Sequence, residues 1–533
     1  RYLETTIIRD ISIRSDSPGN TRNGCVYCSG GKTDFLSRGA SRNRYGNTCS
    51  WRKTIESRLD SSRVIGTIGY RSRISPECFT SQIHIVQIRL NCRAIRTSSV
   101  LAELRNRDGR QDTDDGEGRN IHYLKLGDNS EVELISTRVR KSPFWHLSIE
   151  AGAWRASVYN RMYHPRGYVR PEDGGAMAEY RALVHGVTLW NVAVERQIRV
   201  KGKQAEDFVN YVITRDASRI KVMRGKYCIL CNEKGGILND PVVLRPARDE
   251  FWFSLSDSDL MLWLQGVNTP RRWDVEIDEI DVAPLQIQGP LSEDMMAELI
   301  GEDLRKIPYY GLMEAEIGGA PVLISQTGFS GEKGYEVYVY NAHETAEQVW
   351  YALRGVGARY GLRVIAPGHH RRIAAGILSW GQDMDHETSP FQVNLAFQVP
   401  KKKKADYIGK AALEKQREQI EAGSYPFSLK LVGMKMGGRP ITDYAPDFWL
   451  IQNSEGTRCG YVTSPWWSPE LETNIALGYV PWALSKVGTE LKVELPETYA
   501  EQSGVPVRAV VSEVPFVASE HPSAREQGKG TGE

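Results

Sequence analysis

The stretch TGFSGEKGYEVYVY (residues 327–340) joins three glycines to a strongly alternating run. Tyr335, Val337 and Val339 would lie on one face of a strand, and the residues between them on the other. Residues 320–326 (APVLISQ) form a second apolar run upstream. Because glycine adopts positive φ without steric cost, the glycines between the two runs permit a tight connection. The sequence therefore predicts a β-hairpin that carries Glu336 early in its second strand.

On composition alone, Glu336 has two interpretations. A charged residue in a strand is most often solvated at an edge, and this interpretation is favoured; the other is a hydrogen-bond acceptor directed at a ligand. The neighbouring segment GFSGE (residues 328–332) resembles the G-x-S-x-G motif of serine hydrolases. Glu332 replaces the last glycine of that motif, so serine hydrolase chemistry is not indicated.

The bulk composition is that of a soluble globular protein of about three domains, because 533 residues exceed what one core holds. Hydrophobic residues make up 41% and charged residues 25% of the chain. No apolar run approaches the roughly 18 residues of a membrane span, and no signal-peptide pattern opens the chain. We therefore expect a cytoplasmic protein without a membrane partner.

Residues 1–130 differ from the rest in charge and texture. The first 110 residues hold 18 Arg and 2 Lys against 9 acidic residues, a net charge of +11, which leaves −9 for the remainder. A nucleic-acid-binding arm would explain this charge, but the lack of periodicity favours a basic extension without fixed structure. Cys25 and Cys28 have zinc-knuckle spacing without a second ligand pair, so no metal site is expected. We expect no nucleic-acid partner either.

Residues 138–405 alternate short helices with strands, which predicts an α+β region with mixed sheets. Helices are expected at 179–187, 204–213, 257–265 and 372–380, and strands at 197–201, 227–230, 242–245 and 251–255. The run KKKK (residues 401–404) is interpreted as a solvated turn. A linker helix is expected at 406–425, followed by an all-β region at 426–518 with the spacing of a small barrel, and a flexible tail at 519–533.

Several motifs in this order resemble one family. They are the hairpin TGFSGEKGYE (327–336), the turn EKGGILND (233–240), the strand PLQIQGP (284–290), RIAAG (372–376) and the barrel segments CGYVTS (459–464) and NIALGYV (474–480). Together they resemble the tetrahydrofolate-dependent aminomethyltransferases, whose best-known member is the T-protein of the glycine cleavage system. The resemblance covers residues 138–515 and implies a fold of two α+β subdomains plus a C-terminal small β-barrel, with tetrahydrofolate as cofactor.

Within that family, four segments resemble the dimethylsulfoniopropionate demethylases. They are RKSPF (140–144), VYNRM (158–162), LWNVAVERQI (189–198) and LNDPVVL (238–244). In the last of these, Asn239 stands where T-proteins carry the first of two aspartates. T-protein chemistry uses an acid at that position to manage protons, whereas simple methyl transfer does not require one. Asn191 and Ala193 replace an aspartate and a serine of the demethylase pattern.

The resemblance implies a pterin site built around the hairpin. Glu336 would accept hydrogen bonds from the pterin amino and ring N–H groups, and a carboxylate suits such a pair because charge-assisted bonds are strong. Tyr335 and Phe329 belong to the same hairpin and are predicted to contact the cofactor. Arg372 is predicted to bind a carboxylate of the folate or of the substrate; the alternative is an internal salt bridge.

Asp240 and Asn239 are the predicted catalytic residues, with Asp240 positioning the pterin or accepting a proton; the alternative for Asp240 is a solvated turn residue. Trp190 lies in a demethylase-like segment, and Trp145 and Tyr163 directly follow two others. All three are predicted to contact a sulfonium by cation–π interaction, although core packing is favoured for each. The predicted partner is a small-molecule methyl donor, and the oligomeric state stays open, a homodimer included.

The predicted reaction is methyl transfer from a small sulfonium acid to tetrahydrofolate. A T-protein acting on a lipoyl carrier, or an O-demethylase of methoxylated aromatics, would use the same fold for a related reaction. A non-catalytic folate-binding module is the alternative from a different class of protein.

Overall fold

The computed structural model describes residues 53–60, 63–70, 138–445 and 447–517. The chain divides into two units, Arg1–Ala94 and Ile95–Glu533, and each is described by itself. In the first unit, strands β1 (Lys53–Asp60) and β2 (Arg63–Tyr70) pair antiparallel. The remainder of the predicted basic extension, its C-x-x-C pair and the predicted tail lie outside the described residues.

In the second unit, a five-stranded antiparallel sheet has the strand order β12-β6-β11-β10-β7. Its strands are β6 (Gln197–Lys201), β7 (Arg224–Tyr227), β10 (Val242–Ala247), β11 (Glu250–Ser254) and β12 (Glu276–Glu279). Helices α5 (Ala205–Val212) and α6 (Leu260–Arg271) pack their apolar side chains against it in one buried cluster. The predicted strand at 197–201 is confirmed, and the predicted helix at 257–265 begins three residues later.

A second, six-stranded sheet has the order β14-β15-β16-β13-β5-β17, in which only β17 runs parallel to its neighbour. The strands are β5 (Thr188–Asn191), β13 (Val282–Gln288), β14 (Leu312–Ile317), β15 (Ala320–Ser325), β16 (Gly334–Tyr340) and β17 (Arg363–Val364). Helices α7 (Ser292–Ile300) and α8 (Ala342–Gly357) contribute to the core on one of its faces. The predicted hairpin is confirmed as β15–β16, with Ser325 opposite Glu336.

Short elements connect and flank these two sheets. They are helix α3 (Trp145–Glu150), the hairpin of β3 (Arg155–Tyr159) and β4 (Met162–Gly167), helix α4 (Gly175–His185), and the hairpin of β8 (Leu230–Cys231) and β9 (Ile237–Asn239). The β8–β9 hairpin ends immediately before Asp240. The β3–β4 hairpin carries the demethylase-like segment VYNRM across its turn, where Asn160 and Arg161 have positive φ.

The C-terminal region forms a closed barrel in the order β18-β21-β20-β19-β22-β23, which confirms the predicted barrel. Its strands are β18 (Leu429–Met436), β19 (Trp449–Gln452), β20 (Arg458–Ser468), β21 (Thr473–Pro481), β22 (Glu490–Val493) and β23 (Val507–Ser512). Helix α10 (Lys410–Glu421) precedes the barrel in the chain, within the predicted linker.

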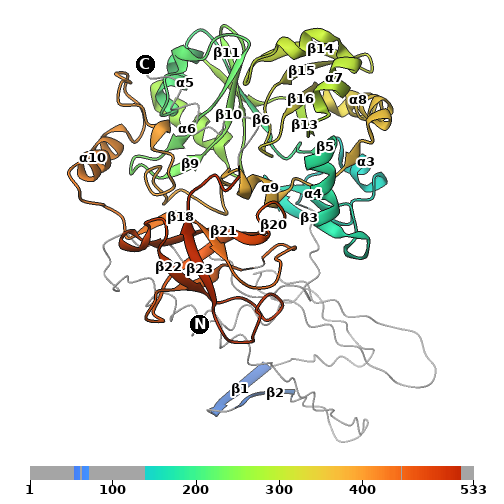
Figure 1. The fold of residues 1–533 in the computed structure, drawn as a ribbon. Coiled ribbons are helices and arrows are strands. Elements are labelled where there is room, and N and C mark those ends of the chain that lie inside the picture. The colour runs from blue at the N-terminus through green and yellow to red at the C-terminus, as the bar shows by residue number, and fades with distance from the viewer. Residues whose placement is uncertain (1–52, 61–62, 71–137, 446, 518–533) are drawn as a thin grey trace, which may run out of the picture. The chain divides into compact units, whose positions relative to one another are not determined.

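Helix α9 (His369–Ala374) lies between the two sheets and the barrel (Figure 1). The sequence predicted a helix from residue 372 to 380, but α9 ends at Ala374. Gly376 has a φ of 72°, a left-handed conformation that stops the helix. The chain after it, residues 375–380, is therefore an irregular segment rather than a helical turn.

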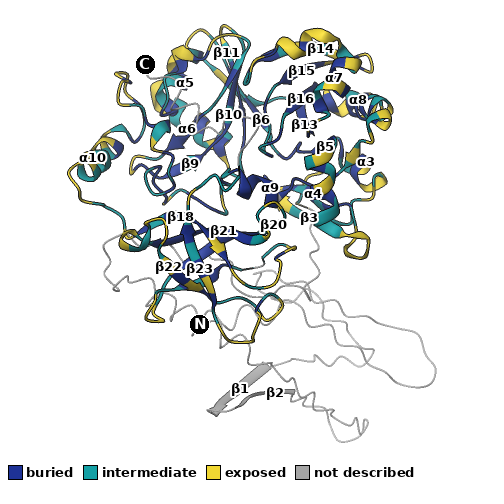
Figure 2. Cartoon of the chain, viewed as in Figure 1, coloured by how far each residue is buried: buried dark blue, intermediate teal, exposed yellow. Residues whose placement is uncertain are grey.

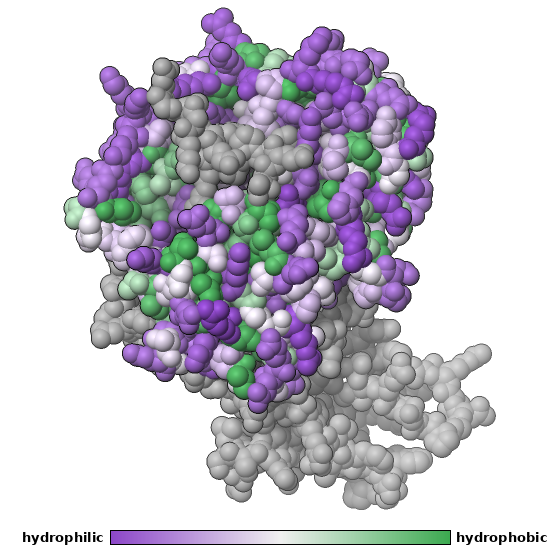
Figure 3. Space-filling view, viewed as in Figure 1, coloured by the Kyte–Doolittle hydropathy of each residue, from purple (hydrophilic) through white to green (hydrophobic). Residues whose placement is uncertain are grey.

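Burial follows these elements closely, with the sheets and barrel strands mostly buried (Figure 2). The face shown in Figure 3 is mainly hydrophilic, with hydrophobic side chains gathered in a few small groups. Among the described residues, no helix combines the length and apolarity needed to cross a membrane.

The predicted solvated turn at residues 401–404 is wrong at Lys403. This side chain is buried, and its Nζ donates to the carbonyl oxygens of Asn210, Ile213 and Arg215 at 2.5, 2.9 and 2.9 Å. These carbonyls lie at and after the C-terminal end of α5, where backbone acceptors lack helical partners. Lys403 therefore caps α5 from inside the protein.

Candidate active site

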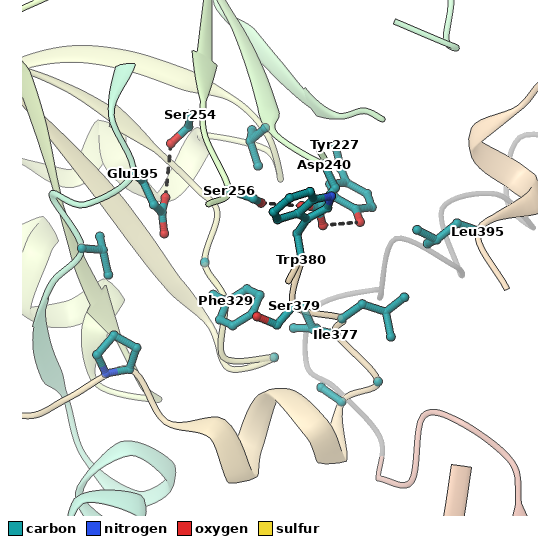
Figure 4. Close-up of a pocket in the computed structure, with 18 of the residues that line it drawn as sticks. Glu195, Tyr227, Asp240, Ser254, Ser256, Phe329, Ile377, Ser379, Trp380 and Leu395 are labelled. Atoms are coloured by element: carbon teal, nitrogen blue, oxygen red, sulfur yellow. Dashed lines mark hydrogen bonds between the residues drawn. The ribbon is translucent and has the colours of Figure 1, made fainter. Parts of the chain in front are cut away.

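A cavity of about 220 Å³ opens where the two sheets, the β3–β4 hairpin, the segment after α9 and the barrel meet. Carboxyl groups and aromatic rings face it from different elements (Figure 4). The polar residues of its wall include Tyr159, His164, Arg166, Glu195, Tyr227, Asp240, Ser254, Ser256, Gln286, Tyr309, Tyr310, Glu332 and Glu336. The cavity therefore brings four acidic side chains together, Glu195, Asp240, Glu332 and Glu336.

Glu336 lines this cavity and is only 4% exposed, so the interpretation as a solvated edge residue is wrong. Its Oε1 accepts from the Gln286 amide at 2.8 Å, and its Oε2 accepts from Thr327 at 2.7 Å and Tyr338 at 2.6 Å. A carboxylate has about four acceptor positions, so one position on Oε1 stays available. Burial raises the pKa of Glu336, and these three donors oppose that shift.

Gln286 adds a second acceptor beside Glu336. The two residues are directly paired across β13 and β16, and both line the cavity. The side-chain oxygen of Gln286 is buried and has no hydrogen-bond partner among the described residues. Because a buried polar atom without a partner is costly, this oxygen is suited to a ligand donor. The pair therefore offers two adjacent acceptors, one on each side chain.

Asp240 follows β9 and lies on another part of the same wall. Its carboxylate accepts hydrogen bonds from the hydroxyl of Tyr227 at 2.9 Å and from Ser256. Burial raises the pKa of Asp240 to about 7, although the two hydrogen bonds lower it. The alternative of a solvated turn aspartate is excluded, since Asp240 is only 8% exposed. A carboxyl group with this pKa can accept or release a proton at neutral pH.

Asn239 is fully buried and lies outside the cavity wall. Its Nδ2 donates to the Ser256 carbonyl at 3.0 Å and the Ser258 hydroxyl at 2.8 Å, and its Oδ1 accepts from the Ser256 N–H at 3.2 Å. These bonds fix the turn that brings the Ser256 hydroxyl to Asp240. Asn239 is therefore placed to position Asp240 through Ser256, rather than to touch a ligand.

Glu195 is an acid that the sequence analysis did not select. It lies between β5 and β6, and its Oε2 accepts from the Ser254 hydroxyl at 3.2 Å (Figure 4), its carboxylate's one hydrogen bond within the described part of the chain. Burial raises the pKa of Glu195 well above its usual range, and the negative charges of Glu336 and Asp240 add to the shift. A cation in the cavity would stabilise its ionised form.

Phe329 lines the cavity, as predicted for a ligand-contacting residue, and Tyr335 does not. Tyr335 precedes Glu336 on β16 and so faces the opposite side of the sheet, where it is fully buried in the core with Val337 and Val339. The alternation predicted for this strand is confirmed, and it directs Tyr335 away from the position where Glu336 meets the cavity.

Arg372 is fully buried and forms an internal salt bridge with Asp383, with Nη1 and Oδ2 2.6 Å apart. It also donates to the Ile377 carbonyl at 3.1 Å and to the Ser464 hydroxyl at 2.8 Å. Thr463 and Ser464 donate in turn to Asp383 at 2.6 Å each. Arg372 thus holds the segment after α9 against β20, and the structure does not place it on the cavity wall with the predicted cofactor contacts.

The three aromatic residues predicted for the substrate also lie away from the cavity wall. Trp145 and Tyr163 stack on each other with ring centroids 5.1 Å apart. Trp190 stands directly opposite Gln286, but its ring is fully buried in a small core cluster and its indole N–H donates to Thr188 at 2.7 Å. Packing is the role that this geometry gives to all three.

Other wall residues escaped the sequence analysis, although three of them lie in or next to the quoted motifs. Gln286 is in PLQIQGP, Glu195 is in LWNVAVERQI, and Tyr159 is in VYNRM. A search for polar residues inside these segments would have found them. Among the described residues, no group of three or more His, Cys, Asp or Glu side chains is arranged to hold a metal ion.

Two sheets and a closed barrel surround the acid-lined cavity, and both parts of this architecture match known domains. Residues 145–403 match the GCVT N-terminal domain, and residues 430–517 match the glycine cleavage T-protein C-terminal barrel domain. The chain belongs to this family of tetrahydrofolate-dependent transferases.

The chain matches several curated relatives over most of the length of each relative. Dimethylsulfoniopropionate demethylase DmdA from Ruegeria pomeroyi is 33% identical over 362 residues, which cover 68% of this chain and 95% of that protein. Aminomethyltransferases from Alkaliphilus metalliredigens and Thermotoga maritima are 32% and 30% identical, covering 60% and 71% of this chain and 85% and 98% of theirs. The glycine cleavage system aminomethyltransferase T from Bartonella henselae has the same fold, with a TM-score of 0.61 at 24% identity, over 72% of this chain and 99% of that one.

Tetrahydrofolate, which members of the family use, fits the residues present. Its pterin ring carries neighbouring N–H donors, and the free acceptor positions of Glu336 and Gln286 lie side by side. Phe329, Tyr309 and Tyr310 provide aromatic surface on the same wall, which suits a flat ring. The chemistry that the cofactor supplies when bound is that of a nucleophilic ring nitrogen.

Proposed function

We propose that this protein transfers a methyl group from a small sulfonium acid, such as dimethylsulfoniopropionate, to N5 of tetrahydrofolate. The observation that carries the proposal is the acid-lined cavity, in which Glu195 keeps one hydrogen bond among the described residues and shares the wall with Glu336 and Asp240. Such a cavity favours a cationic ligand. The similarity to DmdA over nearly its whole length supports the same donor.

The role of the protein in this reaction is to align the two reactants and to hold the released proton. A sulfonium methyl group is already activated, because the sulfur leaves as a neutral thioether when the S–C bond breaks and the N–C bond forms. Asp240, on the cavity wall, would accept the proton lost from N5 when the methyl group is transferred. Alignment of two bound reactants supplies up to about 7–11 kcal/mol of barrier reduction in favourable cases.

Asn239 supports simple methyl transfer over aminomethyl transfer. Its amide is consumed by the turn at residues 256–258, so only Asp240 of this pair faces the cavity. Asn191 and Ala193, which depart from the demethylase pattern, lie in the core. Asn191 donates to Ser148 at 2.9 Å, and neither residue lines the cavity. These two departures therefore do not change the part of the cavity wall that is proposed to bind the methyl donor.

Aminomethyl transfer as in glycine cleavage is the second candidate, because aminomethyltransferases are nearly as similar to this chain as DmdA. The deciding experiment incubates protein and tetrahydrofolate separately with dimethylsulfoniopropionate, a methoxybenzoate and an aminomethylated lipoyl carrier. Formation of 5-methyltetrahydrofolate from the sulfonium acid alone is the expected result. Consumption of only the methoxybenzoate or only the carrier would overturn the donor assignment, and binding of folate without any turnover would indicate a non-catalytic module.

The cofactor site has its own test in Glu336→Ala. We expect tetrahydrofolate binding to weaken by about 1.5–3 kcal/mol, the range for a hydrogen bond to a charged group. Tyr335→Phe is the matched control, since it changes the adjacent residue on the opposite face of β16. Isothermal titration calorimetry measures both variants. Equal affinity for the wild type and Glu336→Ala would refute the placement of the pterin.

We further propose that the protein acts in the cytoplasm and that its partner is a small-molecule methyl donor.

A further inference from the structure

His164 is a buried residue on the cavity wall that has no part in the proton or cofactor contacts of the proposed reaction. It is 6% exposed, and neither of its ring nitrogens has a hydrogen-bond partner among the described residues. Within the described part of the chain, its ring packs against Tyr159, edge-on at a centroid distance of 5.6 Å. Two buried ring nitrogens without hydrogen-bond partners are unfavourable. The site is therefore suited to a ligand that supplies a hydrogen-bonding group to this imidazole.

The direction of His164 is fixed by the β3–β4 hairpin. His164 pairs with Ser157, and Arg166 lies two residues further along β4, at a bulge between the Ala156–Pro165 and Arg155–Gly167 pairs. His164 and Arg166 both line the cavity, and the Arg166 Nε donates to the Ser157 hydroxyl at 2.8 Å. The guanidinium also lies over the Tyr444 ring, 5.8 Å from its centroid, and its positive charge acts on the His164 imidazole. Together the imidazole and the guanidinium form a patch of hydrogen-bond donors on this wall.

Four acids line the cavity, and one of them, Glu332, is paired with Arg371. The other three come from different elements. Glu195 follows β5, Asp240 follows β9 and Glu336 is on β16, whereas the donor patch belongs to the β3–β4 hairpin. Burial and the positive charge of Arg166 lower the pKa of His164 well below its usual range. The imidazole is therefore neutral and offers one N–H donor, and the positive charge of the patch belongs to Arg166.

We propose that His164 and Arg166 form the subsite for the carboxylate of the methyl donor, while its cationic end faces the acids led by Glu195. This inference rests on the proposed function and adds to it the orientation of the donor and the residues that select an acid. It also assigns the same subsite to the carboxylate of a methoxybenzoate, should that be the donor. A donor without a carboxylate leaves the subsite empty and gains nothing from it.

The test compares dimethylsulfoniopropionate with (3-hydroxypropyl)dimethylsulfonium, in which a hydroxymethyl group replaces the carboxylate. The key variant is His164→Phe, which keeps a ring against Tyr159 and removes both nitrogens. We expect its kcat/KM for the acid to fall about tenfold or more, the effect of losing a charge-assisted hydrogen bond. Its kcat/KM for the alcohol and its affinity for tetrahydrofolate should stay within about twofold of the wild type.

Tyr163→Phe is the matched control. Tyr163 precedes His164 on β4 but stacks on Trp145 and does not line the cavity, so neither substrate should be affected. His164→Asn is the second variant, because its amide restores an N–H donor and should recover part of the preference for the acid. Equal losses for acid and alcohol in His164→Phe, or no loss for the acid, would overturn the inference.

A binding measurement separates this inference from the proposed function. Calorimetry with 3-(methylthio)propanoate, the acid that remains after demethylation, needs no turnover. The wild type should bind it at least about tenfold more tightly than 3-(methylthio)propan-1-ol, and His164→Phe should abolish that preference. If no sulfonium donor is turned over and this preference is observed, the proposed function fails and the carboxylate subsite stands. If the sulfonium acid is turned over and the preference is absent, the subsite is wrong and the proposed function stands.

Discussion

At Asp240, burial competes with two hydrogen bonds, and the balance places the pKa at about 7. If the carboxylate accepts the proton released from N5, only its ionised form is active. We therefore expect kcat to rise about tenfold for each pH unit well below pH 7 and to level off above it. In Asp240→Asn the rate should fall and this ascending limb should vanish. Rates measured from pH 5.5 to 9 check both effects; a limb that persists in the variant would assign it to another group.

The titration of Asp240 also predicts a pH dependence of stability. In the folded protein the pKa of Asp240 is about 7, above its usual value of 3.8. The stabilisation that this shift gives is fully present below pH 3.8 and is lost as the pH rises to 7. Asp240→Asn removes this loss. The difference in Tm between the variant and the wild type should therefore shift in favour of the variant from pH 5 to pH 8. A constant difference across that range would contradict the buried, titrating carboxyl group.

Asn239→Asp tests whether the asparagine is structural. The substitution recreates two consecutive acids, but aspartate cannot donate to the Ser256 carbonyl as the amide of Asn239 does at 3.0 Å. It would place a buried carboxylate beside that carbonyl, at a cost of about 1–3 kcal/mol in unfolding free energy. Urea denaturation measures the loss, with Glu233→Asp, in the turn of the β8–β9 hairpin, as a conservative control. A variant as stable as the wild type would refute the structural role.

For single side chains, the sequence identified the right segments more reliably than the right faces. Glu336 and Asp240 line the cavity, but Tyr335 and Asn239, their immediate neighbours, do not. Tyr163 was selected, and the wall residue is His164, one position later. Because side chains alternate along a strand, an error of one residue reverses the face. Periodicity gives the alternation, and only the packing of each sheet decides which face meets the cavity.

At the scale of the element, Lys403 shows how a side chain from a distant segment completes a helix. Its ammonium group caps carbonyls at and after the end of α5, and burial lowers its pKa to about 8. In Lys403→Met these acceptors lose a charged donor, and we expect the unfolding free energy to fall by about 1.5–3 kcal/mol. Lys404→Met is the control, because its side chain is exposed. Equal stabilities of the two variants would contradict the capping role.

The elements themselves divide into those that local sequence specifies and those that it does not. The hairpin β15–β16 was predictable because its alternation and its glycines agree. The end of α9 was not, since the run after Ala374 is apolar and continues a helical pattern. Gly376 stops the helix, and the Arg372–Asp383 pair then binds the following segment to β20. A run of four lysines likewise gives no local sign that Lys403 is buried under α5.

For the whole molecule, strand spacing predicted the barrel, the alternation of short helices and strands predicted an α+β region, and the division into two subdomains came from the family resemblance. Spacing cannot give the arrangement of the six-stranded sheet, in which β13 lies between β5 and β16 although long segments separate them in the chain. That arrangement places Gln286 opposite Glu336. The cavity depends on it, because its wall combines residues from both sheets, from the β3–β4 hairpin and from the barrel.

The positions of the cavity-wall residues along the chain predict which part of the chain the activity requires. The cavity wall runs from Tyr159 to Pro515, and the family match begins at residue 145. A chain that starts at Arg138 should therefore keep the Tm, the tetrahydrofolate affinity and the kcat of the full-length protein. A chain that starts at Gly152 is the control, because it also lacks α3 and the fully buried Phe144 and Leu147. Losing these two core side chains should cost several kcal/mol, since Phe-to-Ala changes alone cost about 3–5 kcal/mol. Thermal unfolding and calorimetry distinguish the outcomes: if the chain starting at Arg138 is folded but inactive, the first 137 residues belong to the enzyme.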